Sequence, residues 1–193
     1  KELDSYLNDT ITSREEALQG AKDIIAEKIS NDMKVRDKIV DSMMNYGRLV
    51  TSKKKNAVDE KMTYKMYYDY SENVSRIATH RIMAIDRGEK EKILTVSISI
   101  NEDYIKTFVS RRYLKNPQSP TAKYVDEAID DGLKRLAYPS LERLVRNTLT
   151  EKAQEASIDV FSDNLGKLLL QAPMKNKRIL GFDPAFRTGC KLA

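Results

Sequence analysis

Residues 139–172 read PSLERLVRNTLTEKAQEASIDVFSDNLGKLLLQA, and this stretch decides the fold class. Its apolar residues recur every three to four positions, which is the period of one helical face. They are Leu141, Leu144, Val145, Leu149, Ala153, Ala156, Val160, Leu165, Leu168 and Leu169. Pro139 indicates a kink or restart and Pro173 an end, so we predict one helix of roughly 50 Å at 1.5 Å per residue. We interpret its apolar stripe as core rather than as an oligomerisation seam, because the other helices need a surface to cover.

Two helices are predicted near the start of the chain. The segment Ser13-Arg-Glu-Glu16 has the form of a capping box and predicts a helix start. An apolar stripe then runs to the break at residues 30–31, through Leu18, Ala21, Ile25 and Ile29. A second stripe ends at Gly47, which we interpret as a C-terminal cap that needs a positive φ. The short joint between the stripes predicts two antiparallel helices.

Three more helices are predicted before residue 139. Thr79 is placed to cap a helix that runs toward Gly88, and Asn101 to cap one that ends at Tyr113. Ser119-Pro120 supplies a cap and a first-turn proline for a helix that reaches Tyr138. The composition agrees, with 40% hydrophobic and 33% charged residues and only 7 Gly and 5 Pro. The fold class expected is therefore mainly α, a multi-helix bundle.

A small β element accompanies these helices. Residues 93–100 read ILTVSISI, a strict alternation that places all the apolar side chains except that of Ile93 on one face. A lone strand is not stable, so residues 48–52 or the terminal segment 178–193 must pair with it. We therefore predict strands at about 48–52, 93–100 and 178–193.

Several residues allow both a functional and a structural interpretation. Tyrosines cluster in residues 62–70 and could stack bases, but such aromatics more often fill a core and hydrogen-bond at its edge. Residues 53–55 are three lysines that could contact phosphate, yet a solvated turn is favoured for so short a run. His80 is the only histidine and cannot build a metal site or a triad by itself. We favour the structural interpretation of all three.

Composition also limits the cellular setting. Cys190 is the only cysteine, which excludes an intramolecular disulfide and a zinc-binding thiol cluster. The longest apolar runs, such as residues 168–170, are far shorter than the roughly 20 residues that a membrane span requires. The chain begins at Lys1 and ends in a segment that reads as the opening of a strand, so we expect an internal piece of a longer protein. We expect a cytoplasmic location, no membrane contact and no metal or other cofactor.

The net charge of +5 comes from the C-terminal end of the chain. Residues 1–164 hold 28 basic and 28 acidic residues, whereas residues 165–193 hold six basic residues and one acid, Asp183. A local excess of cations attracts phosphate, although a charged turn without any partner is an alternative. The residues that we predict to bind nucleic acid are Lys175, Lys177, Arg178, Arg187 and Lys191.

Residues 178–193, RILGFDPAFRTGCKLA, predict a strand, a tight turn with Pro184 and Gly189, and a second strand. This hairpin resembles the first hairpin of the YqgF-type, RNase-H-like domain that occurs in the bacterial Tex transcription accessory family. Four upstream segments resemble the same family in the same order: EEALQGAKDIIAEKIS at 15–30, YYDYSE at 67–72, HRIMAIDRGEKE at 80–91 and PSLER at 139–143. Together the five segments span nearly the whole chain.

The resemblance implies a large multidomain protein with a helical N-terminal region, a YqgF-like domain, helix-hairpin-helix elements and a C-terminal OB-fold RNA-binding module. Its family role is transcription-associated binding of nucleic acid. Residues 1–172 would form the helical N-terminal and central region, and residues 173–193 a truncated first hairpin of the next domain. Most of the nucleic-acid contact would then belong to domains outside this chain.

Asp183 has two interpretations under this resemblance. In RNase-H-like nucleases a carboxylate on the first strand joins others to bind divalent metals that activate water. One carboxylate cannot do this alone, so we expect no catalytic residue here, and a turn-forming role before Pro184 is an equal alternative.

The leading hypothesis is therefore a non-catalytic scaffold and nucleic-acid-associated region of a transcription accessory protein that binds RNA or DNA. One alternative is a metal-dependent RNase-H-like nuclease in the full-length chain. Another is a protein-interaction module that docks the transcription or translation machinery.

Overall fold

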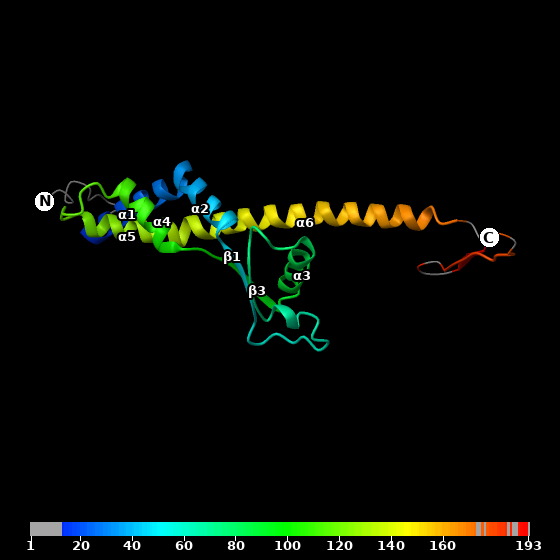
Figure 1. Cartoon of the computed structure of the whole chain (residues 1–193). Coiled ribbons are helices and arrows are strands. Elements are labelled where there is room, and N and C mark those ends of the chain that lie inside the picture. Colours follow the sequence, from blue (N-terminus) through cyan, green and yellow to red (C-terminus); the bar gives the residue numbers. More distant parts are fainter. Residues whose placement is uncertain (1–12, 173–174, 176, 185, 187–188, 193) are drawn as a thin grey trace. The chain divides into compact units, whose positions relative to one another are not determined.

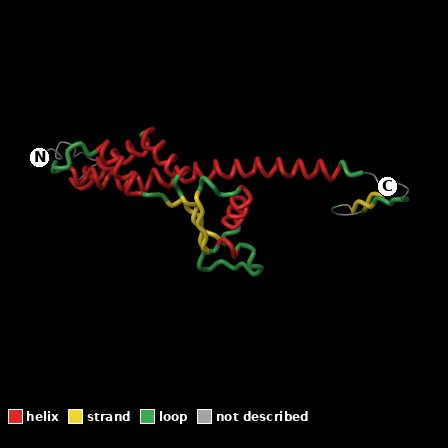
Figure 2. Tube along the Cα trace, in the orientation of Figure 1, coloured by secondary structure: helices red, strands yellow, loops and turns green. Residues whose placement is uncertain are grey.

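The computed structural model describes residues 13–172, 175, 177–184, 186 and 189–192. Helices dominate it, with short strands between and after them (Figure 2). The chain divides into two compact units, Lys1–Ser157 and Ile158–Ala193, and the long helix α6 (Tyr138–Leu169) contains the point of division. The predicted fold class is confirmed. The predicted domain boundary after residue 172 stays a prediction.

Five α-helices precede α6 among the described residues of the first unit, and their caps follow the sequence only in part. They are α1 (Arg14–Asn31), α2 (Met33–Asn45), α3 (Thr79–Lys90), α4 (Glu102–Tyr113) and α5 (Ala122–Asp131). Ser13 and Glu16 form both bonds of the capping box, and the Asn101 side chain accepts from the amide of Tyr104 at 3.0 Å. The Thr79 cap is wrong, because the residue is already inside α3 and no side chain caps that helix.

The buried face of α1 differs from the predicted stripe. Ala21 is exposed, and the buried side chains of this helix are those of Ala17, Ala26, Ile29 and Ser30. The reason lies in Gly132, because a Cβ there would come within 2.8 Å of the backbone oxygen of Ala26. Small residues on both sides let the two backbones approach closely, so the face is chosen by fit as well as by hydrophobicity.

A three-stranded antiparallel sheet lies beside α3 (Figure 1). Its order is β2-β1-β3, with β1 (Arg48–Lys53) central between β2 (Asp69–Asn73) and β3 (Leu94–Ser99). The predicted pairing of the first and second strand segments is confirmed, with Leu49 opposite Ile98. β3 buries every second residue, as its alternation predicts. β2 was not predicted.

Two glycines are required by close packing rather than by backbone conformation. Gly47 is buried and does not have a positive φ, so the predicted capping role is wrong. A Cβ at Gly47 would lie 2.3 Å from the backbone oxygen of Met43. A Cβ at Gly88 would lie 2.7 Å from Leu94 and 2.9 Å from Tyr64, so α3 passes over the sheet at this point and continues to Lys90.

The tyrosine cluster belongs to the core, as predicted. One contiguous set of buried side chains runs from α1 through the sheet to α6, and it includes Tyr64 at 3% exposure. Tyr67, Tyr68 and Tyr70 pack partly buried against this set. The Tyr68 hydroxyl donates to Asp59 at 2.9 Å and that of Tyr70 to Glu72, so their polar ends are satisfied at the edge.

Helical structure is continuous from α5 to α6 through a π-helical turn, η3 (Gly132–Ala137). Pro139 follows this turn. Proline has no amide hydrogen to donate to the carbonyl four residues before it, and its ring crowds that carbonyl, which favours a wider turn just ahead of it. The restart predicted at Pro139 thus takes the form of a π turn.

The stripe on α6 is core over only its first half. Leu141, Val145, Leu149 and Ala153 are buried, as predicted, whereas the prediction for Leu144 is wrong because its side chain is exposed. Beyond residue 157 the predicted core positions are wrong for the described residues, because Val160, Leu165, Leu168 and Leu169 are exposed. Periodicity identifies a helical face, but burial needs a partner that covers it.

Candidate nucleic-acid interface

The second unit contains the predicted hairpin. β4 (Phe182–Pro184) and β5 (Cys190–Leu192) pair antiparallel, so that Asp183 lies opposite Lys191. Gly189 has a φ of +83°, a conformation that glycine adopts without the steric penalty of a Cβ. The hairpin therefore forms where the turn residues predict it.

The predicted binding residues fall on this unit in two groups. Lys175, Lys177 and Arg178 are exposed and precede β4, whereas Lys191 is exposed on β5. Arg187 lies outside the described residues. Within the described part of the chain, no ion pair or hydrogen bond engages the four described side chains. Their positive charges are therefore available to an anionic partner.

Many cations of the first unit are engaged within the fold. Lys22, Arg81, Lys106, Arg112, Arg135 and Arg146 form ion pairs with carboxylates of other elements or of their own helix. The hydrogen bonds of Lys106 to Asp130 and Asp126 raise the pKa of that lysine despite partial burial. These contacts hold helices and strands together and leave those cations partly neutralised.

The most buried of these ion pairs joins α3 to α6. Arg146 donates to Glu89 at 2.9 Å and to Asp86 at 3.2 Å, and its side chain is 19% exposed. Thr150 donates to the other oxygen of Asp86 at 2.6 Å. Because every carboxylate here has a donor, we interpret this cluster as structural.

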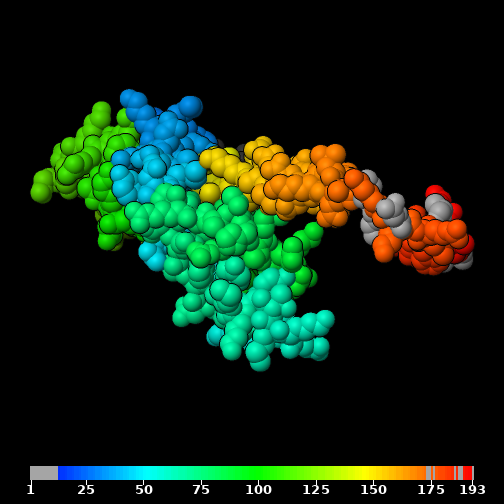
Figure 3. Space-filling model, turned by 45° about the vertical axis from the view of Figure 1, so that its right-hand side comes forward, coloured from blue at the N-terminus to red at the C-terminus, as the bar shows by residue number. Residues whose placement is uncertain are grey.

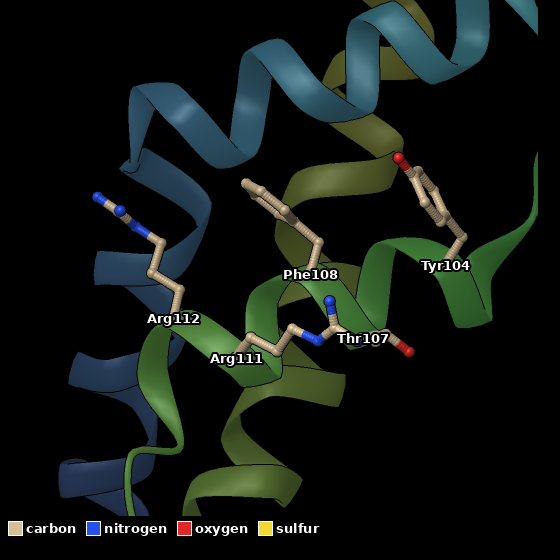
Figure 4. Close-up of a pocket in the computed structure, with 5 residues that line it drawn as sticks. All are labelled: Tyr104, Thr107, Phe108, Arg111 and Arg112. Carbon is tan, nitrogen blue, oxygen red and sulfur yellow. The ribbon is translucent and has the colours of Figure 1, made fainter.

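A cavity of about 610 Å³ opens beside α4 (Figure 4). Its lining is Tyr104, Thr107, Phe108, Arg111 and Arg112. Figure 4 shows the two aromatic rings directed toward α2. The Arg112 guanidinium is held by Asp32 at 2.6 Å, which leaves Arg111 as the cation without an ion pair in this described lining. The cavity suits an apolar side chain or a flat ring better than a phosphate.

Asp32 holds Arg112, one of the residues that line this cavity. Burial would raise the pKa of Asp32, but hydrogen bonds from Arg112 and Tyr113 outweigh it and the pKa is lowered. This cavity was not predicted from the sequence. The spacing of Tyr104, Phe108 and Arg111 at four and three residues on one helix was the available signal.

Among the described residues, no group of three or more His, Cys, Asp or Glu side chains is placed to hold a metal ion. Asp183 is exposed on β4, with Lys191 opposite. His80 is exposed in the first turn of α3. In the same described part of the chain, no helix combines the length and apolar character needed to cross a membrane.

Comparison with known proteins identifies relatives over nearly the whole chain. A protein-family model described as Tex central region-like matches residues 1–161. The "Uncharacterized protein YdcI" of Bacillus subtilis is 46% identical over 98% of this chain and 27% of that protein. S1 RNA-binding domain-containing protein 1 of Homo sapiens is 37% identical over 75% of this chain and 15% of that protein. Transcriptional accessory protein Tex of Neisseria gonorrhoeae is 29% identical over 97% of this chain and 26% of that protein. The chain thus spans at most 27% of the length of these three relatives.

Proposed function

This chain belongs to the Tex central region-like family, and on that premise we propose that it is the scaffold and nucleic-acid-associated region of a transcription accessory protein. Two relatives support the proposal by name, one as a transcriptional accessory protein and one as an S1 RNA-binding domain-containing protein. The contact with transcription machinery that such a role requires is part of this proposal. So is a cytoplasmic location, which suits an exposed cysteine without a disulfide partner, Cys190.

The observation that carries the proposal is the local charge balance, because residues 165–193 hold six basic residues and one acid whereas residues 1–164 hold equal numbers of both. Arginines such as Arg146 and Arg112 in the first unit are tied to carboxylates, and they stabilise the scaffold. Lys175, Lys177 and Arg178 are exposed and unengaged within the described residues. When exposed cations without internal partners bind phosphates, the counterions condensed on the nucleic acid are released, so the binding free energy depends strongly on salt.

The test is a titration of the 193-residue chain with labelled single-stranded RNA and with duplex DNA at several salt concentrations. The hairpin variant carries Lys175→Gln, Lys177→Gln, Arg178→Gln and Lys191→Gln. The slope of log K against log salt is negative, and losing four phosphate contacts should reduce its magnitude by about 2.8 for single-stranded RNA. We expect weaker binding in step with that change.

A matched control variant removes the same charge elsewhere. Lys28, Lys34, Lys134 and Lys152 are exposed on four helical segments of the first unit, and none forms an ion pair with another described residue. Changing these four to Gln should leave the salt slope close to that of the parent. Equal losses in both variants would indicate a general effect of net charge, and the hairpin assignment would then be wrong. Absence of binding to either nucleic acid would overturn the nucleic-acid part of the proposal and leave a scaffold only.

We propose no catalytic role for this chain, and Asp183 provides the test. Incubation of the chain with RNA and Mg²⁺ should leave the RNA intact. Cleavage that requires Mg²⁺ and is lost in Asp183→Asn would contradict this part of the proposal and favour the nuclease alternative.

A further inference from the structure

One end of the three-stranded sheet carries a second group of cations, which includes residues 53–55, the three lysines predicted from the sequence to form a solvated turn. The sheet-end surface, as we define it, consists of residues 53–65 and 87–92. It holds eight basic residues, Lys53, Lys54, Lys55, Lys61, Lys65, Arg87, Lys90 and Lys92, against four acidic ones, Asp59, Glu60, Glu89 and Glu91. Because residues 1–164 are balanced in charge as a whole, this excess is a local segregation of charge.

Backbone contacts bring the two segments of the sheet-end surface together. The amide of Lys54 donates to the carbonyl of Ile93 at 2.9 Å, directly after the paired residues Lys53 and Leu94. The Tyr64 ring lies against Gly88, which fixes the first segment over the end of α3. In Figure 1 the loop after β1 is the cyan segment at the lower edge, beyond the end of the sheet. In the space-filling view of Figure 3 the same region protrudes from the molecular surface.

The loop is held in one conformation by an acidic residue inside it. The Asp59 carboxylate accepts from the amides of Thr63 at 3.0 Å and Tyr64 at 2.9 Å, and from the Tyr68 hydroxyl at 2.9 Å. These bonds, the one from the Tyr64 amide foremost, lower the pKa of Asp59. The lysines on either side are therefore presented by an ordered loop, which reduces the entropy lost when a partner binds.

Most of the acidic residues of the surface have internal partners. Glu89 pairs with Arg146, and Glu91 acts on the buried Tyr64 hydroxyl, whose pKa is raised by burial first and by Glu91 second. With Asp59 held as described, Glu60 is the acid of this set that has no such bond among the described residues. The lysines at 54, 55, 61, 65, 90 and 92 are all exposed. The carboxylates thus organise the loop while the cations face solvent.

The chemistry favours a phosphate backbone over bases or lipid. Tyr64 is buried and Tyr68 lies under the Lys53 ammonium at 4.7 Å, so neither offers a free face for stacking a base. The exposed apolar residues nearby are Val58, Met62 and Met66, without the Trp, Phe or Leu typical of membrane insertion.

We infer that the sheet-end surface is a second contact for the sugar-phosphate backbone of a nucleic acid, independent of base sequence. This inference rests on the proposed association with nucleic acid, but it does not depend on the hairpin residues. It places a cationic contact in the first unit, which otherwise serves as the scaffold.

The experiment compares three variants of the 193-residue chain in the same salt-dependent titration with single-stranded RNA and duplex DNA. The sheet-end variant carries Lys54→Gln, Lys55→Gln, Lys61→Gln and Lys65→Gln, and it keeps Lys53 and Asp59. The hairpin variant and the matched control variant are those described above. Circular dichroism and the melting temperature check that each variant is folded. Vesicles of phosphatidylserine and phosphatidylcholine in equal parts serve as the lipid probe.

We expect the sheet-end variant to bind RNA about tenfold more weakly at low salt. The magnitude of its slope of log K against log salt should fall by about 2.8. The control variant should keep the affinity and the slope of the parent. If the sheet-end variant binds RNA as the parent does while the hairpin variant binds more weakly, this inference is overturned and the proposed function stands. No binding by the parent would overturn both. Binding to the vesicles that the sheet-end changes abolish, with RNA binding unaltered, would assign the surface to lipid and overturn the inference.

Asp59→Ala separates an ordered contact from a simple sum of charges. The change removes a negative charge, so if affinity depended only on the net charge of the surface, the variant would bind RNA more tightly. Loss of the three bonds to Asp59 disorders the loop, and the inference therefore predicts weaker binding. Tighter binding by folded Asp59→Ala would overturn the ordered-loop argument.

Discussion

Gly132→Ala tests the claim that close backbone approach determines how α1 packs. The added Cβ would lie 2.8 Å from the oxygen and 3.0 Å from the Cα of Ala26. Both atoms belong to the α1 backbone, so relief requires α1 to move rather than a side chain to rotate. Overpacking of this kind costs about 1–3 kcal/mol, and replacing glycine by alanine in a helix returns about 0.5–1 kcal/mol. The expected net loss is about 1–2 kcal/mol in the free energy of unfolding.

Gly20→Ala is the matched control, because it makes the same chemical change on α1 with no other atom within 4 Å of the new Cβ. That variant should gain about 0.5–1 kcal/mol from helix propensity alone. Urea unfolding followed by circular dichroism gives both free energies under the same conditions. If Gly132→Ala is as stable as the parent or more so, the close contact does not constrain α1 and the reasoning fails.

Three further predictions concern single contacts. Arg146→Leu leaves Asp86 and Glu89 without their cation and should lower the free energy of unfolding by about 2 kcal/mol, less than for a fully buried pair. The exposed neighbour change Arg143→Leu should stay within about 0.5 kcal/mol of the parent, and equal losses would refute the buried-pair argument. Glu142 accepts from the amide of Ile98 at 2.8 Å on the outer edge of β3, so Glu142→Ala should speed hydrogen exchange of that amide about tenfold. Glu142→Gln, which keeps an acceptor, should largely preserve its protection, and unchanged exchange in Glu142→Ala would show that the bond is unimportant. Hydrogen bonds from Tyr70 and Arg81 lower the pKa of Glu72, so its contribution to stability is present near pH 7 and is lost as the pH falls through that lowered pKa. The stability difference between the parent and Glu72→Gln should therefore shrink on acidification, and a difference constant with pH would contradict this.

Local motifs were predictable from the sequence because their bonding partners are close in the chain. Ser13 and Asn101 cap helices through amides three residues away. The alternation in residues 93–100 likewise predicted both a strand and its buried face. β2, with the sequence DYSEN, carries no such alternation of apolar residues. It forms because its backbone pairs antiparallel with β1.

Features that depend on distant partners were not predictable. Gly47 reads as a helix cap in sequence, but a Cβ there would meet the backbone oxygen of Met43 at 2.3 Å and also Ile98 of β3 at 3.0 Å. Arg112, which lines the cavity beside α4, is held by Asp32, 80 residues away in the sequence. The hairpin cations were found from charge alone, whereas the sheet-end surface required the fold to bring two separate segments together.

The π turn before α6 affects which deletions and substitutions the sequence tolerates at this point. A π turn closes its hydrogen bonds over five residues rather than four, so it can lose one residue by reverting to α geometry, whereas a second deletion within residues 132–137 would turn α6 by about 100° relative to α5. Leu141 and Val145 would then leave the side on which Ala128 and Ile129 are buried. Substitutions at the exposed positions of this turn, residues 134 and 135, act locally, but its length sets the phase between two helices. We therefore expect relatives to vary these exposed residues more freely than the number of residues in the turn.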